Sequence, residues 1–192
     1  MGHKGEVLRQ KIVAAADLLF YQQGYESTSF SDIAAAVNIS RGNFYYHFKT
    51  KDEILKAVLH YREAAYHVLL EEWDKQYSDP EDRIRAYLGM LAANKDNIKN
   101  HGCPAGSLCT ELAKVRHTLL RDANKQMSIT RDWLIKQFKL MGHKKDAKSL
   151  AMHVLARTQG IATITNVFED QKFLQQELKE LEQWIDALDG AS

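Results

Sequence analysis

The stretch SRGNFYYHF, residues 40–48, holds side chains that are well suited to binding a polar partner. Arginine, asparagine, tyrosine and histidine form hydrogen bonds with phosphates and with the edges of bases, and their flat groups lie against sugars and methyl groups. From Ser40 to Lys51 the charged side chains are Arg41, Lys49 and Lys51, so this short segment carries a charge of +3. A local excess of positive charge beside polar aromatic residues indicates a surface that binds nucleic acid.

Burial in a hydrophobic core is the alternative explanation for the aromatic residues of this stretch. If the stretch is helical, Phe44 and Phe48 are four positions apart, share one face and pack on neighbouring helices. Burial does not explain why Tyr45, Tyr46 and His47 lie between them. We therefore expect the two phenylalanines in the core and the other three aromatic side chains on a contact surface.

The second stretch with reactive groups is HGCPAGSLC, residues 101–109. Pro104 suits the first position of a helix, which would place Cys103 at the N-cap. The positive end of a helix favours a thiolate, so Cys103 is expected to be the more reactive of the two cysteines. A small buried residue at the start of a helix is the alternative role for Cys103.

A metal site and an enzyme active site are two further interpretations. The possible metal ligands have neither a CxxC pair nor the usual zinc spacing, and they are His101, Cys103, Cys109 and His117. Glu111 lies near Cys109 and His117 in the sequence, but no nucleophile elbow, phosphate loop or HExxH motif accompanies them. We therefore expect no metal, no cofactor and no enzymatic activity.

Composition places the chain among cytoplasmic globular proteins. Its 192 residues are 45% hydrophobic and carry a net charge of +1, so only a local patch could attract nucleic acid. Two cysteines close together fit a reducing compartment. The N-terminal residues lack the hydrophobic region of a signal peptide, and the uncharged stretch Thr158–Phe168 is too short to span a bilayer.

The elements that would position these residues are all helical. Apolar residues recur at spacings of three and four, as Leu8, Ile12, Ala15 and Leu19 do in the first helix. About nine helices are expected from these patterns. Their ranges are 6–22, 29–37, 40–48, 52–76, 80–97, 105–113, 116–140, 145–167 and 170–188. A tight turn at Val37-Asn38-Ile39 joins the second and third helices and predicts a helix-turn-helix motif.

The segment TSFSDIAAAVNISRGNFYYHFKTKDEIL, residues 28–55, closely resembles the DNA-binding signature of TetR-family transcriptional repressors. The resemblance extends over about residues 7–58. It implies an all-α protein with a helix-turn-helix DNA-binding domain at residues 1–50. Residues 51–192 would then form a helical domain for ligand binding and dimerisation.

The resemblance also implies which residues contact DNA. They are Thr28, Ser29, Ser40, Arg41, Gly42, Asn43, Tyr45, Tyr46, His47 and Lys51. Thr28 and Ser29 would hold one phosphate at the start of the second helix, and Lys51 would bind another. Gly42 would let the backbone of the recognition helix approach the major groove closely. A dimer would place its two recognition helices about 34–36 Å apart, so a palindromic operator is expected.

For the remaining two-thirds of the chain the resemblance implies a homodimer through the last two helices. Residues 170–188 carry an amphipathic seam, and burial of that seam within one chain is the alternative. An unknown small-molecule inducer is expected to bind between the middle helices. Candidate lining residues, each of which could equally be plain core, are Met90, Trp133, Phe138, Met141, Met152 and His153. The Gly102-Cys103 pair is similar to one in electrophile- and oxidant-sensing members, so thiol modification is a second possible signal.

The leading function is therefore a ligand-responsive repressor that binds double-stranded operator DNA, since repression is the default in this family. A helical protein-interaction scaffold without specific DNA binding is the alternative. Salt distinguishes the two, because binding to DNA weakens steeply as salt rises and an apolar protein contact does not.

Overall fold

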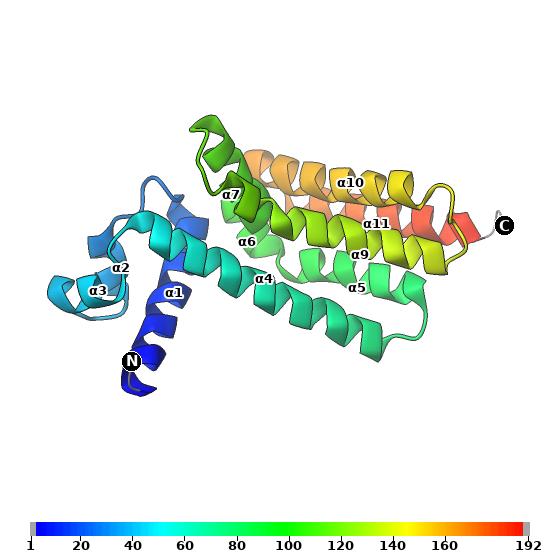
Figure 1. Ribbon diagram of the computed structural model, residues 1–192. Helices are drawn as coiled ribbons and strands as arrows, with labels where there is room; N and C mark the ends of the chain where they lie inside the picture. The colour runs from blue at the N-terminus through cyan, green and yellow to red at the C-terminus, as the bar shows by residue number, and fades with distance from the viewer. Residues whose placement is uncertain (1–2, 190–192) are drawn as a thin grey trace. The chain divides into compact units, whose positions relative to one another are not determined.

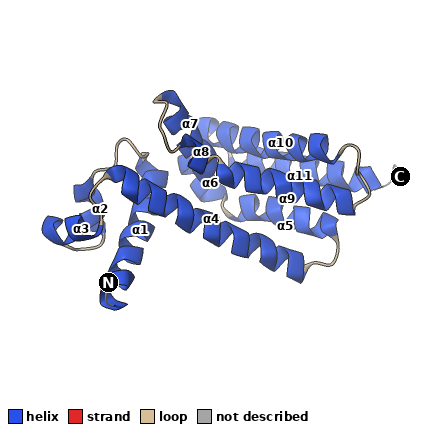
Figure 2. Ribbon diagram, in the orientation of Figure 1, coloured by secondary structure: helices blue, strands red, loops and turns tan. Residues whose placement is uncertain are grey.

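The computed structural model describes residues 3–189, and within this range it contains helices and loops only (Figures 1 and 2). The helices are α1 (His3–Gln23), α2 (Phe30–Ala36), α3 (Arg41–His47), α4 (Lys51–Gln76), α5 (Pro80–Ala93), α6 (Lys95–His101), α7 (Pro104–Lys114), α8 (Leu120–Ala123), α9 (Lys125–Leu140), α10 (Ala147–Phe168) and α11 (Gln171–Asp189). The all-α prediction is confirmed. None of the helices in residues 3–189 is long and apolar enough to cross a membrane.

Two of the expected helices are each divided at an asparagine, which raises the number of helices from about nine to eleven in the described residues. The expected helix 80–97 ends as α5 before Asn94, whose side-chain amide donates to the carbonyl of Met90 at 2.8 Å. The expected helix 116–140 is interrupted at Asn124, between α8 and α9. Asparagine favours such breaks because its side chain competes for backbone hydrogen bonds.

By packing, the described residues fall into two compact units. One contains the residues up to Ala65 together with Ser107–Lys125, and the other contains Tyr66–Gly106 and the residues from Gln126 onward. Helices α4 and α7 therefore contribute residues to both units. The functional boundary expected at residue 50 remains a prediction.

The first unit has one hydrophobic core, built from α1, α2, α3, the start of α4 and α7. Its buried members are Ile12, Val13, Ala16, Phe20, Tyr25, Ile33, Ala34, Phe44, Phe48, Ile54, Leu55, Val58, Leu59, Leu108, Leu112 and Ala123. The buried face of α1 is broader than the predicted stripe. Ile12 is fully buried together with Val13, Ala16 and Phe20, and the rest of the stripe, Leu8, Ala15 and Leu19, is partly buried against the same core. Apolar residues therefore occupy two adjacent rows of α1, and both contribute to the core.

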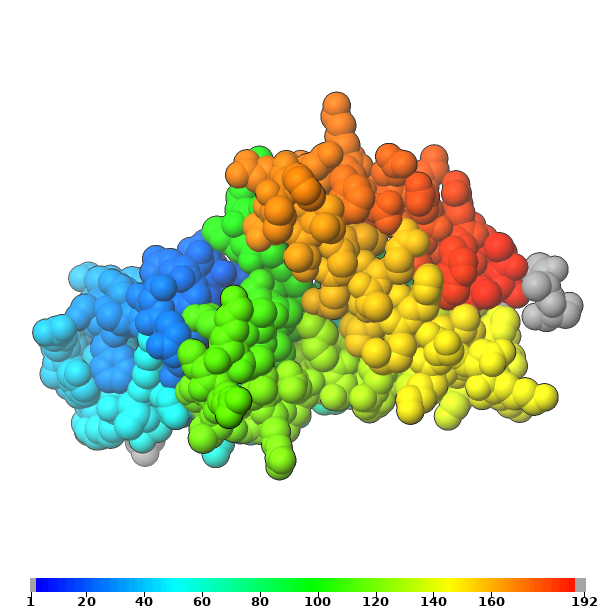
Figure 3. Space-filling view, turned by 90° about the horizontal axis from the view of Figure 1, so that it is seen from above, coloured from blue at the N-terminus to red at the C-terminus, as the bar shows by residue number. Residues whose placement is uncertain are grey.

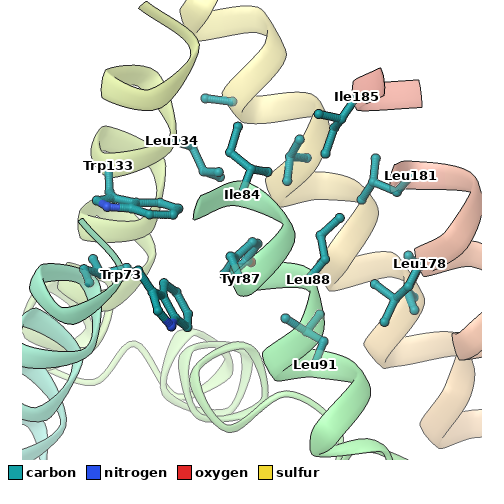
Figure 4. Packing of buried hydrophobic residues seen from close by; sticks show 14 of the residues in the cluster. Trp73, Ile84, Tyr87, Leu88, Leu91, Trp133, Leu134, Leu178, Leu181 and Ile185 are labelled. Atoms are coloured by element: carbon teal, nitrogen blue, oxygen red, sulfur yellow. The ribbon is translucent and has the colours of Figure 1, made fainter. Parts of the chain in front are cut away.

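The second unit packs α5, α9, α10 and α11 with the last part of α4 around another core (Figure 4). Trp73 and Trp133 lie at one side of this core, with ring centres 5.8 Å apart. Leu178, Leu181 and Ile185 close it from α11. Helices α10 and α11 run side by side, and in Figure 3 their side chains, yellow to red, form much of the visible surface of this unit.

Candidate nucleic-acid interface

The helix-turn-helix is held in shape by two caps and one left-handed residue. Ser29 and Asp32 form a capping box at the start of α2, because the Ser29 hydroxyl accepts from the Asp32 amide and the Asp32 carboxylate accepts from the Ser29 amide. The hydrogen bonds from the Ser29 side chain and backbone lower the pKa of Asp32. Asn38 has a φ of +54°, which asparagine tolerates, and it turns the chain toward Ser40, the N-cap of α3.

One face of α3 is anchored in the core of the first unit. Phe44 and Phe48 are each 1% exposed, as predicted, and Phe44 packs against Phe30 of α2 with ring centres 5.2 Å apart. The guanidinium of Arg9 lies 4.8 Å from the centre of the Phe48 ring. These contacts fix the rotation of α3 about its own axis, so they also decide which residues face solvent.

The opposite face of α3 presents polar aromatic groups to solvent. Tyr45 is 44% exposed and Tyr46 is 65% exposed, while Gly42 and Asn43 are exposed beside them. His47 is half-buried, and its Nδ1 atom has no hydrogen-bond partner. An exposed surface of this kind offers donors and flat rings to a groove of DNA.

Arg41, at the first position of α3, is oriented by α2. Its Nε and Nη2 atoms donate to the hydroxyl of Ser31, at 3.1 and 2.5 Å. Ser31 was not among the residues predicted from the sequence, because nothing in the spacing marks a contact between positions ten apart in two different helices. Holding the guanidinium at the surface reduces the entropy that Arg41 loses when it binds an anion.

The residues expected to hold phosphates are placed differently from one another. Ser29 is exposed at the start of α2, but Thr28 is only 1% exposed and its hydroxyl donates to the carbonyl of Gly24 at 2.7 Å. Lys51 begins α4, and its Nζ atom donates to the carbonyl of Glu26 at 2.9 Å. Lys51 and Ser29 are therefore available at the surface near the loop that precedes α2, and Thr28 supports this loop from within.

Cys103 lies in the second unit. Helix α7 begins at Pro104, as predicted, and the Cys103 sulfur accepts a hydrogen bond from the amide of Gly106 at 3.4 Å. A Cβ atom at position 106 would lie 2.5 Å from Oε1 of Gln159, so a larger residue there would displace the Gln159 side chain of α10. Cys103 is a half-buried thiol.

The residues considered as metal ligands or as pocket lining are placed as follows. In residues 3–189 no group of three or more His, Cys, Asp or Glu side chains could hold a metal ion. Trp133 and Phe138 are buried in the core of the second unit, whereas Met152 and His153 are exposed on α10. For Met152 and His153 the expected place in an internal pocket is thus wrong, because they lie on the outer face of their helix.

Two short helices joined by a tight turn, with the second anchored by phenylalanines and exposing tyrosines, define a DNA-binding protein of the helix-turn-helix class. A family model for the bacterial regulatory proteins of the tetR family matches residues 12–58. The helix-turn-helix of this chain thus matches the DNA-binding domain of the tetR-family regulators, and similarity to further proteins of this kind supports a transcriptional regulator.

Similarity to other regulators extends along the chain. Over 188 residues it is 24% identical to the HTH-type transcriptional regulator TtgR of Pseudomonas putida, covering 93% of this chain and 88% of that protein. Over 72 residues it is 36% identical to IcaR of Staphylococcus epidermidis, a negative transcriptional regulator of a biofilm operon, covering 37% of this chain and 39% of that protein. A solved structure of a TetR transcriptional regulator from Legionella pneumophila has the same fold, with a TM-score of 0.81, 23% identity and coverage of 93% and 95% of the two chains.

Proposed function

We propose that this protein is a repressor that binds a palindromic operator as a homodimer. A small-molecule inducer, or modification of Cys103, would release it from DNA. The exposed face of α3 carries the DNA-binding part of the proposal. The proposed contact residues are Ser29, Ser40, Arg41, Gly42, Asn43, Tyr45, Tyr46, His47 and Lys51, with Thr28 in a supporting position behind Ser29. Repression is favoured by the similarity to IcaR, which is named a negative regulator.

The dimer would form through α10 and α11. An exposed apolar row follows α10 at intervals of four residues, and its members are Met152, Ala156, Gly160, Ile164 and Phe168. Val167 and Phe168 are 66% and 71% exposed, which is unusual for large apolar side chains on a monomer. Ala156 and Gly160 lie in the middle of the row, where small residues let a second helix approach closely. A groove beside this row continues onto Phe173 of α11.

The regulatory ligand would enter the second unit, where hydroxyl groups occur inside an otherwise apolar core. The Thr130 hydroxyl donates to the Tyr66 phenol at 3.0 Å, and the Tyr87 phenol lies 3.1 Å from the Thr158 hydroxyl. A few polar groups in an apolar interior are typical of small-molecule sites. Their burial supports an inducer that is mainly apolar and carries one or two hydrogen-bonding groups.

The DNA-binding proposal is tested by selecting genomic fragments with the wild-type protein and measuring their affinity for variants. We expect Tyr46→Ala and Lys51→Ala to weaken binding to the selected palindrome. Tyr61→Ala is the matched control, because Tyr61 is 51% exposed on α4 but lies outside the proposed surface. If Tyr61→Ala weakened binding as much as Tyr46→Ala, the assignment of α3 as the contact surface would be wrong.

The same assay separates DNA binding from a scaffold function. The slope of log affinity against log salt is about −0.9 for each phosphate contacted, so a repressor should lose affinity steeply between low and moderate salt. If no fragment bound, and if partner capture were insensitive to salt, the scaffold interpretation would replace the repressor.

Thiol control is tested by adding the oxidant diamide to the operator complex. Release from wild type but not from Cys103→Ser would establish Cys103 as the sensor, with Cys109→Ser as the control that should still respond. If oxidant released no DNA, Cys103 would be structural and the inducer would be an ordinary pocket ligand.

A further inference from the structure

The loop between α1 and α2 is held by a carboxylate from a distant part of the chain. Oε2 of Glu111, in α7, accepts the backbone N–H of Tyr25 at 2.9 Å, and Oε1 accepts the N–H of Glu26 at 2.8 Å. Gly24 makes room for this contact, because its φ is +91° and a Cβ atom there would lie 3.2 Å from Oε1 of Glu111. Charged acceptors bind backbone amides more strongly than neutral ones, so a bidentate carboxylate defines the conformation of the loop.

The loop in turn positions Lys51. The Lys51 ammonium donates to the carbonyl of Glu26 and lies 4.5 Å from the centre of the Tyr25 ring. Glu26 therefore binds Glu111 through its N–H and Lys51 through its carbonyl. A shift of this one residue would move the ammonium that is proposed to meet a phosphate.

A second set of contacts holds the same region from the residues that follow α7. The Tyr25 hydroxyl donates to Oδ1 of Asp52 at 2.8 Å, and Nε2 of His117 lies 3.4 Å from the same oxygen. The amide of Leu119 donates to Nδ1 of His117 at 3.1 Å, which leaves the proton of a neutral imidazole on Nε2, facing Asp52. The loop, Lys51 and α7 thus form one connected polar network within the first unit.

We propose that Glu111 is a positioning residue for operator binding, which acts through the loop and Lys51 without touching DNA. Glu111 lies outside residues 12–58, the part matched by the family model. The inference rests on the proposed phosphate contact of Lys51. The effect of neutralising Glu111 distinguishes this role from simple electrostatics. Removing a negative charge from a DNA-binding unit should by itself strengthen binding, whereas losing the position of Lys51 should weaken binding.

The test uses the full-length protein and the highest-affinity palindromic fragment selected with wild type. Glu111→Gln keeps the size of the side chain but places an amide NH₂ against one of the two backbone N–H groups. We expect it to weaken binding about tenfold and to reduce the salt slope by up to about 0.9. Glu6→Gln makes the same charge change at an exposed position in the first turn of α1 and should not weaken binding.

A double-mutant cycle with Lys51→Ala shows whether Glu111 acts through Lys51. In the Lys51→Ala background, Glu111→Gln should lower the affinity for the fragment by less than about twofold. Thermal unfolding of each variant establishes that binding is measured on folded protein. If Glu111→Gln lowered the affinity equally in wild type and in Lys51→Ala, or in neither, the inference would be overturned while the DNA-binding proposal stayed intact. If Lys51→Ala alone had no effect, its phosphate contact would be wrong and the inference would fall with it.

Discussion

Neighbouring aromatic residues in α3 have separate tasks, and mutation should separate them. Phe44 is buried against Phe30, so Phe44→Ala should lower the free energy of unfolding by about 3–5 kcal/mol. Tyr46 is exposed, so Tyr46→Ala should change stability by about 0.5 kcal/mol or less. Urea denaturation of both variants measures the difference. A large loss of stability in Tyr46→Ala would mean that its ring supports the fold and would weaken its assignment to DNA.

Buried phenols should make the second unit sensitive to alkali. Burial raises the pKa of Tyr66 from 10.0 to about 12. The folded state therefore keeps this proton where the unfolded chain has lost it, so the contribution to stability is intact below pH 10 and is lost as the pH rises to about 12. We expect the free energy of unfolding of wild type to fall through this window. The free energy of unfolding of Tyr66→Phe should fall less steeply with pH. An identical decline in wild type and variant would contradict the prediction.

Residue types alone indicated much of the proposed DNA-binding surface, but not the residues that hold it in position. Two phenylalanines four apart with tyrosines between them already predict which side of α3 is buried. The roles of Ser31 and Glu111 depend on which segments meet in space, and neither carries a local pattern. Thr28 shows the reverse, because its type suited a phosphate contact but its hydroxyl is bound to Gly24.

At the scale of elements, Asp74 joins the last part of α4 to α9. Its carboxylate accepts from Lys136 at 2.6 Å, from the indole of Trp133 at 3.1 Å and from Gln137 at 3.2 Å. Burial acts to raise the pKa of Asp74, but the hydrogen bonds from Lys136 and Trp133 outweigh it and lower the pKa below 3.8. The stabilisation is therefore present above pH 3.8 and is lost as the pH falls through the lowered pKa.

Asp74→Ala should accordingly lower the stability by about 2 kcal/mol at neutral pH, since hydrogen bonds to charged groups are lost. The difference between wild type and variant should shrink in acid, below pH 3.8. Urea denaturation of wild type and Asp74→Ala at neutral pH and below pH 3.8 measures this difference in stability. A difference that stayed constant with pH would mean that packing, and not the charge, is responsible.

Most helices could be predicted from periodicity, whereas their ends and partners could not. Pro80 and Pro104 mark helix starts correctly, because proline suits the first turn. The breaks at Asn94 and Asn124 were missed, since asparagine also occurs within helices. The packing of residues 107–125 with the first helices could not be predicted, because contacts between distant segments produce no periodic pattern in the sequence.

At the scale of the whole molecule, a dimer through α10 and α11 can be tested with a variant that keeps the fold of each protomer. A Cβ atom at Gly160 meets nothing within 4 Å, so Gly160→Arg should fold normally and obstruct a second copy. We expect this variant to sediment as a monomer and to lose the operator affinity that depends on two recognition helices. Gly89→Arg is the matched control, because Gly89 is exposed on α5 with the same open space. A dimeric Gly160→Arg would place the interface elsewhere.

The composition of the first unit has a consequence for synthesis on the ribosome. The core around Phe20 and Tyr25 includes Leu108 and Leu112, so it is incomplete when residue 65 is made. About 60 further residues must be translated, which takes about 3–12 s at typical rates of synthesis. During this interval the nascent chain exposes apolar surface that its own later residues will cover. The helix-turn-helix is thus the first part of the chain to be made, but it is completed only when residues beyond the middle of the chain have emerged.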